Sequence, residues 1–310
     1  MVIFAFIGMC LAWGFSWFAM KLQVNSIVPI EISVLYRFFA VAILMILLCL
    51  TTKTRLKPFR TEYKYFFVIA LTNFSLNFLI GYHATNYIPS GMIAVIFSLT
   101  IITSEILKSI FDGKKIEKKI IFSSLFGFIG LLFFIFPTIK FHENSSNYSI
   151  IFGFILAILM MIIFSTGNYL VEKNKRQNHT PLFTSIAFAS SISSIYLIII
   201  NLFLGNKLVF DYSYKYIFSL IYQIFIATIV AFLCLYYLIQ KIGTVKASYT
   251  ALIYPIIALV VSSFLENFEF TILGTIGLLF ILTALILEFF YSYFNNKFFT
   301  IFKNVLKARI

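Results

Sequence analysis

The sequence predicts an all-α polytopic membrane protein with ten transmembrane helices, and three observations lead to this fold class. Of the 310 residues, 61% are hydrophobic and only 11% are charged, whereas a soluble domain is about half apolar and about a quarter charged. The mean hydropathy is +1.00. The apolar residues also fall in runs of about 20, the length that an α-helix needs to cross the hydrocarbon with its backbone bonded internally.

Ten such runs follow one another along the chain, separated by short clusters of basic residues. Their expected limits are residues 2–20, 28–50, 65–83, 90–111, 119–137, 149–171, 182–204, 216–239, 247–266 and 270–291. Cytoplasmic loops carry an excess of lysine and arginine. The loops after the second, fourth, sixth and eighth runs and the segment after the tenth are rich in both. The opposite loops carry only Lys140, Lys207 and Lys215, with Lys21 at a helix end. Both termini are therefore expected in the cytoplasm.

The net charge of +13 is explained by this topology and by anionic lipid, so nucleic-acid binding is not expected. The three histidines and both aspartates lie at the ends of the runs or in loops. They form no histidine cluster, paired carboxylates or metal-ligand spacing, and no phosphate-binding glycine loop occurs. We therefore expect no catalysis, metal or cofactor. The expected partners are the lipid bilayer and a small-molecule substrate, for a monomer or a homodimer.

Two stretches of the chain resemble each other, which predicts an internal repeat. Residues 91–116 followed by 122–134, and residues 245–270 followed by 274–284, each read as a helix, a short charged turn and a glycine-bearing helix. Shared membrane composition is the alternative explanation. A repeat of five spans, an odd number, places its two copies in opposite orientations, as in secondary transporters with a substrate site near the midplane. The expected division is 1–140, 141–292 and a basic cytoplasmic tail, 293–310.

The segment 12–45 resembles the first hairpin of EamA-type transporters of the drug/metabolite transporter superfamily. The matching residues are Trp13, Gly14, Phe18, Lys21, Pro29, Arg37, Phe38 and Ala40, and in the second half Tyr254, Pro255, Gly274 and Gly277. The resemblance implies a bacterial cytoplasmic-membrane carrier of amino acids or related metabolites, usually an exporter. Two features depart from the family pattern: no proline lies around residues 99–103, and the turns after the fourth and ninth runs read "DGKK" and "ENFE".

Trp13 and Trp17 are expected to form one wall of a transport path. Trp13 lies about a dozen residues into the first run, near mid-bilayer and away from the aromatic belts, where its indole N–H needs an acceptor. Trp17 lies one helical turn further along the same face. The small residues between them, Gly14 and Ser16, are typical of a helix-packing face.

Arg37 is the deepest cation, about ten residues into the second run, and it cannot lose its proton. One interpretation is a fork that binds a carboxylate or phosphate of the substrate. The other is a structural pairing with backbone carbonyls or with a glutamate at a helix end, such as Glu31 or Glu266. Together with the aromatic residues, Arg37 favours a solute that carries a carboxylate and some apolar surface.

Glu105 is the only carboxylate that the expected limits place well inside a span. It is either half of an ion pair with Lys108, one turn on, or a proton-coupling or gating acid. Pro255, deep in the ninth run, frees backbone carbonyls and is expected to act as a hinge.

Uncharged polar residues fall at matching depth in several runs, and many of them serve only to bond one helix to another. Asn73 and Asn77 are expected to share a face, and two carboxamides on one face are hard to satisfy in lipid. From the whole set we select as candidate substrate-binding residues Asn73, Asn77, Thr100, Tyr249 and Tyr254.

These features predict a secondary transporter of small organic metabolites, amino acids or related carboxylates, working as an exporter. The runner-up is uptake or exchange of a host-derived metabolite, either nucleoside-containing or phosphorylated. A membrane-embedded enzyme or a channel is the alternative of another class, and a channel shows no countertransport.

Overall fold

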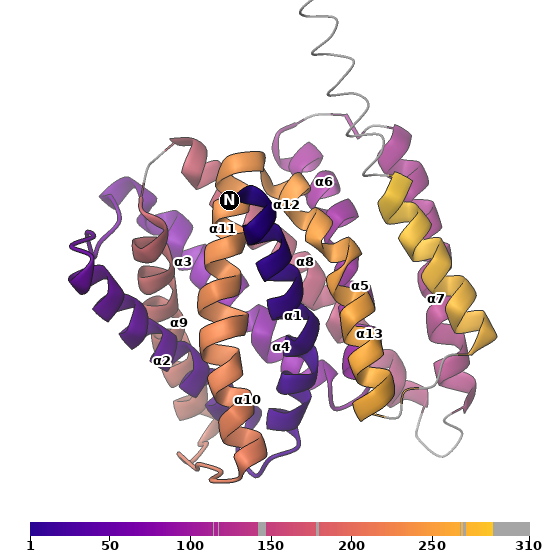
Figure 1. Cartoon of the computed structure of the whole chain (residues 1–310), viewed down its shortest axis with the longest axis horizontal. Coiled ribbons are helices and arrows are strands. Elements are labelled where there is room, and N and C mark those ends of the chain that lie inside the picture. The colour runs from indigo at the N-terminus through magenta and orange to yellow at the C-terminus, as the bar shows by residue number, and fades with distance from the viewer. Residues whose placement is uncertain are drawn as a thin grey trace, which may run out of the picture.

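The computed structural model describes residues 1–113, 115–116, 118–141, 147–177, 180–266, 268 and 271–287. Every regular element in these residues is helical. Within the described part of the chain, nine helical spans are long and apolar enough to cross a membrane, and a shorter apolar helix covers Ile272–Leu287. The helices stand side by side in one bundle (Figure 1). The predicted class, an all-α polytopic membrane protein, is confirmed.

The spans, in chain order, are Val2–Val24 (α1), Ile30–Thr51 (α2), Arg60–Ala84 (η1, α3, η2, α4), Ser90–Phe111 (α5, α6), Ile120–Pro137 (in α7, Lys118–Phe141), Tyr148–Asn174 (in α8, Asn147–Gln177), Leu182–Leu204 (α9), Tyr214–Ile242 (α10, η3, α11) and Thr244–Leu265 (α12, η4, α13). The fourth and seventh agree with the expected limits at both ends. The sixth helix continues past its apolar run to Gln177. The expected tail, 293–310, lies outside the described residues.

The first span shows how an almost wholly apolar helix divides its surface between lipid and protein. Residues three or four apart lie on one face of a helix. One face is exposed and carries Phe4, Ile7, Leu11 and Phe15. The other is buried and carries Met9, Trp13, Trp17 and Met20. The tryptophans therefore point into the bundle. Gly14 lies on the buried side, where an added Cβ would meet Ile257 of α13, which confirms its expected packing role.

The third and eighth spans are each interrupted by a π-helical segment. These segments are Thr72–Leu76, between α3 (Tyr63–Leu71) and α4 (Asn77–Ala84), and Phe225–Val230, between α10 (Tyr214–Ile224) and α11 (Ala231–Ile242). A π-segment frees carbonyls of the preceding turn. In each span a hydroxyl bonds the carbonyl five residues back: Ser75 Oγ donates to Ala70 O at 3.0 Å, and Thr228 Oγ1 to Gln223 O at 2.7 Å.

The fourth and ninth spans are both broken near their middle. The fourth consists of α5 (Ser90–Ser98) and α6 (Thr100–Phe111), and the ninth of α12 (Thr244–Ser248), a 3₁₀ turn (Tyr249–Leu252) and α13 (Tyr254–Leu265). Pro255 lies in the first turn of α13, where its missing N–H breaks no helical bond. It therefore starts a helix segment rather than kinking a continuous helix.

The break in the fourth span forms without a proline. Ser98 Oγ donates to Val95 O at 2.5 Å and Leu99 N to Ile96 O at 3.1 Å, so the chain turns with bonds three residues back. Thr100 Oγ1 likewise donates to Phe97 O. Hydroxyl groups thus replace the proline that the family pattern has here.

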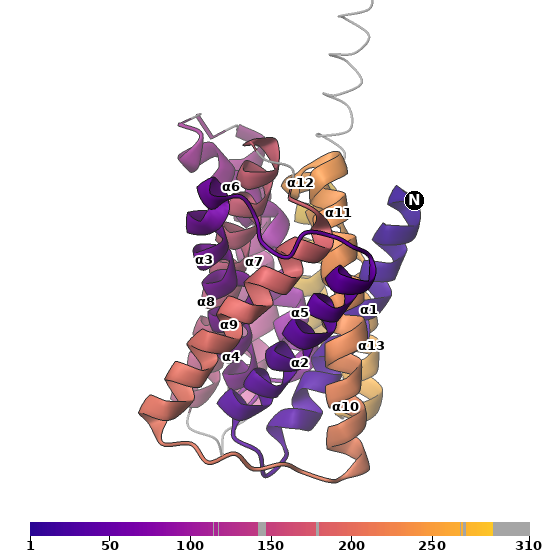
Figure 2. The same ribbon diagram turned by 90° about the vertical axis from the view of Figure 1, so that its left-hand side faces the viewer.

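Helices of each half of the chain pack against helices of the other half. The first span packs against the eighth and ninth, and the sixth packs against the third and fourth. The second and seventh spans, α2 and α9, lie against each other, as do the fourth and ninth. Figure 2 shows α2 and α9 crossing side by side. This packing, together with the matched π-segments and breaks, is what two like halves of five spans in opposite orientations produce.

The fifth span and the Ile272–Leu287 helix form a pair at one edge of the bundle (Figure 1). Two glycines, Gly130 and Gly277, occupy corresponding places in the repeat and meet where these helices cross. A Cβ on Gly130 would lie 2.7 Å from Gly277 O and 2.8 Å from Ile281 N. Only a residue without a side chain allows this approach of two backbones.

Gly130→Ala is expected to lower the stability of the purified protein, because the added methyl group meets backbone atoms that cannot turn aside. Overpacking of this kind costs about 1–3 kcal/mol. Gly8→Ala is the matched control, since its nearest neighbour, Cys234 Sγ, would be at an ordinary 3.6 Å. Thermal melting in detergent compares the two variants. Equal melting temperatures would show that the two helices are not in close contact.

Candidate functional site

A small cavity lies in the middle of the bundle, among the first, second, third, fourth, sixth and eighth spans. It is lined by Trp13, Ser16, Trp17, Met20, Arg37, Asn77, Phe78, Phe97, Met160, Phe164 and Gln223. Four of the predicted site residues, Trp13, Trp17, Arg37 and Asn77, are therefore brought together here. The cavity volume is ≈ 30 Å³, enough for about two water molecules, so an organic solute requires some of these side chains to move.

Arg37 is buried in the wall of the cavity. Its exposed fraction is 1%, and Nε donates to Thr228 Oγ1 at 2.7 Å. The guanidinium carbon lies 4.2 Å from the centre of the Phe78 ring and 5.4 Å from that of Phe38. No carboxylate among the described residues lies within ion-pair distance of it. An anionic group entering the cavity would supply the missing charge.

The two glutamates considered as partners of Arg37 are engaged elsewhere. Glu31 Oε1 lies 2.9 Å from His83 Nε2, and Glu31 Oε2 accepts from Asn206 Nδ2 at 3.4 Å. Glu266 accepts from the backbone N–H of Ser90 at 3.0 Å and from its hydroxyl. The interpretation of Arg37 as half of an ion pair with either glutamate is wrong.

Three polar atoms of the cavity-lining residues are buried and have no hydrogen-bond partner among the residues that the structure describes: Trp17 Nε1, Asn77 Oδ1 and Gln223 Oε1. Leaving such an atom unpaired costs about 1–3 kcal/mol. The amide of Gln223 is held in place because Nε2 donates to Ser16 O at 2.7 Å. Besides the Arg37 cation, the cavity-lining residues thus carry two buried acceptors and one buried donor that are unpaired among the described residues.

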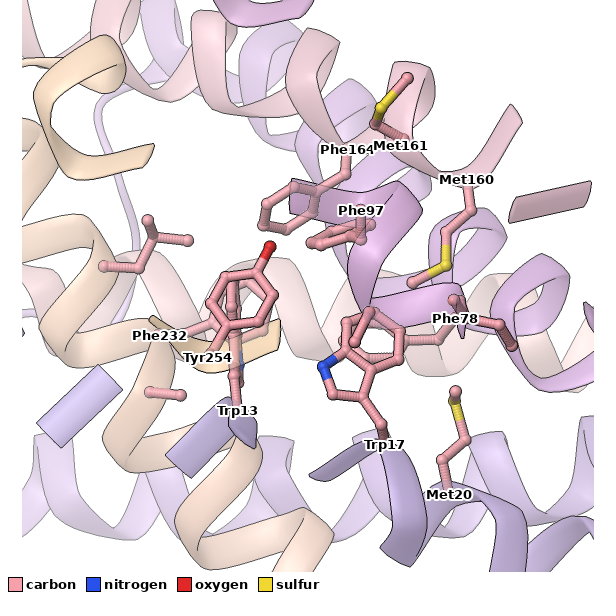
Figure 3. Packing of buried hydrophobic residues seen from close by; sticks show 14 of the residues in the cluster. Trp13, Trp17, Met20, Phe78, Phe97, Met160, Met161, Phe164, Phe232 and Tyr254 are labelled. Carbon is pink, nitrogen blue, oxygen red and sulfur yellow. The ribbon is translucent and has the colours of Figure 1, made fainter. Parts of the chain in front are cut away.

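Aromatic side chains make up much of the remaining lining, and Figure 3 shows how Trp13, Trp17, Phe97 and Phe164 lie close to one another. Phe97 lies 5.3 Å from Trp17 and 4.9 Å from Phe164 between ring centres, and Phe164 lies 5.5 Å from Trp13. The indole N–H of Trp13 finds the acceptor that its depth requires: Nε1 donates to Ala227 O, in the π-segment of the eighth span, at 3.2 Å. The interruption of that helix therefore holds Trp13 in the wall.

The other predicted substrate-binding residues are not among those that line the cavity. Tyr254 packs on Trp13 and Trp17 at ring distances of 5.9 and 6.5 Å. Tyr249 is 7% exposed, in the 3₁₀ turn of the ninth span. Thr100 is buried in the fourth span, where it bonds to its own helix.

Asn73 and Asn77, expected on one face, have different surroundings. Asn73 Nδ2 donates to Asn168 Oδ1 of α8 at 2.9 Å, whereas Asn77 lines the cavity. The π-segment between them adds a residue to the turn, so positions four apart no longer lie directly above each other.

The expected pairing of Glu105 with Lys108 is not what the structure shows. Lys108 Nζ lies 3.0 Å from Glu172 Oε1, on the sixth span. Glu172 Oε2 also accepts from the first backbone N–H of α12, at Thr244, over 2.8 Å. Gly243 allows this contact, because the one-residue turn before α12 has φ 84°. Glu105 is half-buried on α6. We refer to Lys108, Glu172 and Thr244 as the inner cluster.

Glu172 was missed because the expected sixth run ends at residue 171, directly before a basic segment. The structure places Glu172 within the span Tyr148–Asn174 and only 5% exposed. Glu105 is therefore not the only carboxylate inside a span. The sequence feature that could have identified it is a glutamate directly after the end of an apolar run.

A second cluster lies at the opposite end of the fourth span and borders an open vestibule of ≈ 720 Å³. Lys21, Glu266 and Ser90 form this outer cluster; Lys21 Nζ donates to Thr85 O, and Glu266 holds the N-terminus of α5. Lys21 is not within ion-pair distance of Glu266. Each cluster thus combines a lysine with a glutamate that accepts the first N–H of a helix, and in this conformation only the inner lysine and glutamate are paired.

A helical bundle of two like halves, with a charged cavity at its centre and a vestibule at one end, defines a multi-pass membrane transporter. Comparison with known proteins agrees. The model of the EamA-like transporter family matches residues 1–136 and 151–290, and the chain belongs to this family.

Relatives are found among bacterial proteins. The chain is 28% identical over 257 residues to an "Uncharacterized transporter" of Buchnera aphidicola subsp. Schizaphis graminum, covering 83% of each chain. It is 25% identical over 263 residues to "Protein PagO" of Salmonella typhimurium, covering 85% of this chain and 84% of that protein. A solved structure described only as "Crystal structure of protein" matches with a TM-score of 0.65 and 12% identity over 92% of this chain and 95% of the other. This last likeness shows the fold alone.

Proposed function

We propose that the protein is a secondary transporter that moves small carboxylate-bearing metabolites, amino acids or related solutes, across the bacterial cytoplasmic membrane. The observation that carries the proposal is Arg37, a buried guanidinium in a central cavity, without a carboxylate partner among the described residues. A permanent charge inside a membrane protein is costly and marks a solute or ion pathway. The planar fork of arginine matches a carboxylate.

The rest of the cavity supports a solute with both polar and apolar parts. Trp17, Asn77 and Gln223 carry polar atoms that the protein leaves unpaired. Apolar contacts come from Phe97, Phe164 and the flexible side chains of Met20 and Met160. Methionine adapts to different shapes because it is unbranched and polarisable. These walls suit a small amino acid better than a large phosphorylated compound.

Alternating access accounts for the two charged clusters at the ends of the fourth span. The vestibule at the outer cluster is lined by Phe18 and Lys21, which directly follow the cavity residues Trp17 and Met20 in the chain. The inner cluster is paired. On the charge distribution of the loops, the vestibule end is the extracytoplasmic end and both termini are cytoplasmic. Export is the direction that the family resemblance favours, and the two five-span halves, 1–140 and 141–292, would rock about the cavity.

Counterflow in proteoliposomes tests the proposed function. The purified full-length protein is reconstituted, the vesicles are loaded with an unlabelled amino acid, and entry of the same labelled amino acid is followed, for a panel of apolar amino acids. We expect saturable entry that the internal amino acid accelerates. Entry that never saturates would indicate a channel. If nucleosides or sugar phosphates were exchanged and no amino acid, the proposed substrate class would be wrong.

A further inference from the structure

We infer that Asn77 and Gln223 determine specificity by receiving the protonated amino group of a solute whose carboxylate binds Arg37. This inference rests on the proposed function and adds to it the group that separates accepted from rejected carboxylates. Gln223 lines the cavity together with Asn77.

The geometry brings the two carboxamides to the arginine. Thr228 Oγ1 accepts from Arg37 Nε at 2.7 Å and donates to Gln223 O at 2.7 Å, so the hydroxyl bridges the guanidinium to the backbone of Gln223. On the other side, the guanidinium carbon of Arg37 lies 4.2 Å from the centre of the Phe78 ring, and Phe78 directly follows Asn77 in the chain. A small solute bound to Arg37 therefore lies between residues 77 and 223.

The unpaired atoms define the chemistry of the missing group. Asn77 Oδ1 and Gln223 Oε1 are hydrogen-bond acceptors. Both residues are 1% exposed, and neither oxygen has a donor among the described residues. A carboxylate cannot satisfy them, because an ionised carboxylate only accepts. An ammonium group offers three donors and no acceptor, and its hydrogen bonds to neutral oxygens are charge-assisted. The remaining unpaired atom, Trp17 Nε1, is a donor and suits the carboxylate.

Selectivity arises because a solute without an amino group leaves the two acceptor oxygens without a hydrogen-bond donor. A simple carboxylic acid would bind Arg37 but would bury both acceptors unpaired, and a hydroxy acid would satisfy only one of them. Sites that bury hydrogen-bonding groups reject ligands lacking the complementary group. One or two unpaired acceptors correspond to binding weaker by about 10- to 100-fold.

Matched probes test the inference by calorimetry and thermal melting of the full-length protein. The probes are leucine and phenylalanine, their deaminated acids isocaproate and hydrocinnamate, and their decarboxylated amines isoamylamine and phenethylamine. We expect at least one amino acid to bind at least about 10-fold more tightly than its deaminated acid, and neither amine to bind. If an amino acid and its deaminated acid bound equally, the inference would be overturned while the proposed function stood. If neither amino acid nor deaminated acid bound, the proposed function itself would fail for this substrate class.

Variants assign the selectivity to the two residues. Asn77→Leu and Gln223→Leu should each weaken amino-acid binding by about 10-fold while leaving binding of the deaminated acid unchanged, so that the ratio of the two affinities falls. Asn168→Leu removes a buried carboxamide outside the cavity and should leave the ratio as in the wild type. An unaltered ratio in both leucine variants would contradict the inference.

Discussion

Arg37→Gln is expected to abolish binding and transport of carboxylate-bearing solutes while the protein without solute stays folded. Loss of a buried charge-assisted pair costs about 2–5 kcal/mol, which corresponds to at least about a 30-fold loss of affinity. The glutamine side chain can still donate to Thr228, the partner of Nε at 2.7 Å. The fold does not require the charge, because it has no counter-ion among the described residues. The loss of affinity is measured as a smaller ligand-induced rise in the melting temperature.

Arg55→Gln is the matched control for this experiment. Arg55 also stacks on a phenylalanine, with its guanidinium carbon 3.8 Å from the Phe59 ring centre, and it donates to Lys57 O at 2.6 Å. It lies in the loop between the second and third spans, away from the cavity. Binding should be as in the wild type. A full ligand-induced shift in Arg37→Gln would remove Arg37 from the site.

Lys108→Glu is expected to reduce transport by at least about 10-fold with little effect on binding at the central cavity. Lys108 Nζ now lies 3.0 Å from Glu172 Oε1, and the substitution replaces this ion pair with two carboxylates. Because the two like charges repel each other, the inner end can no longer close. A carrier that cannot close one end cannot complete its cycle. Counterflow measures the loss, and calorimetry with the same amino acid shows whether binding is preserved.

Charge exchange provides the decisive control for the inner cluster. The double variant Lys108→Glu with Glu172→Lys should recover part of the flux. Recovery is expected to be partial because Glu172 also accepts the Thr244 N–H at 2.8 Å, which a lysine cannot do. Lys64→Glu, a change of the same charge at an exposed residue of α3 outside the cluster, should transport normally. Normal flux in Lys108→Glu would show that the inner pair has no part in the cycle.

Most of the fold could be predicted from the sequence because lipid imposes a length and a composition on every span. The helix ends were less predictable, since a helix such as α8 continues through polar residues to Gln177 once it leaves the apolar run. The interruptions were not predictable. Pro255 suggested one in the ninth span, but the break at Leu99 depends on serine and threonine hydroxyls, and the two π-segments leave no mark in an apolar sequence.

The candidate site was predictable where a residue is out of place in lipid. Trp13 and Arg37 stand out by their depth, and both line the cavity. Phe97 and Met160 line it too, but nothing distinguishes them from the lipid-facing apolar residues around them. Asn73 and Asn77 have the same side chain in the same run, and only the π-segment between them decides which one reaches the cavity.

We propose that a solute path runs through the cavity between the two halves of the chain. Cysteine accessibility tests it most directly, in a variant whose native Cys10, Cys49 and Cys234 are replaced. Asn77→Cys should react with a membrane-impermeant thiol reagent, and an amino acid that binds should slow the reaction. Phe15→Cys, on the lipid-facing side of α1, should not react. If Asn77→Cys were as unreactive as Phe15→Cys from both faces of the membrane, there would be no central path.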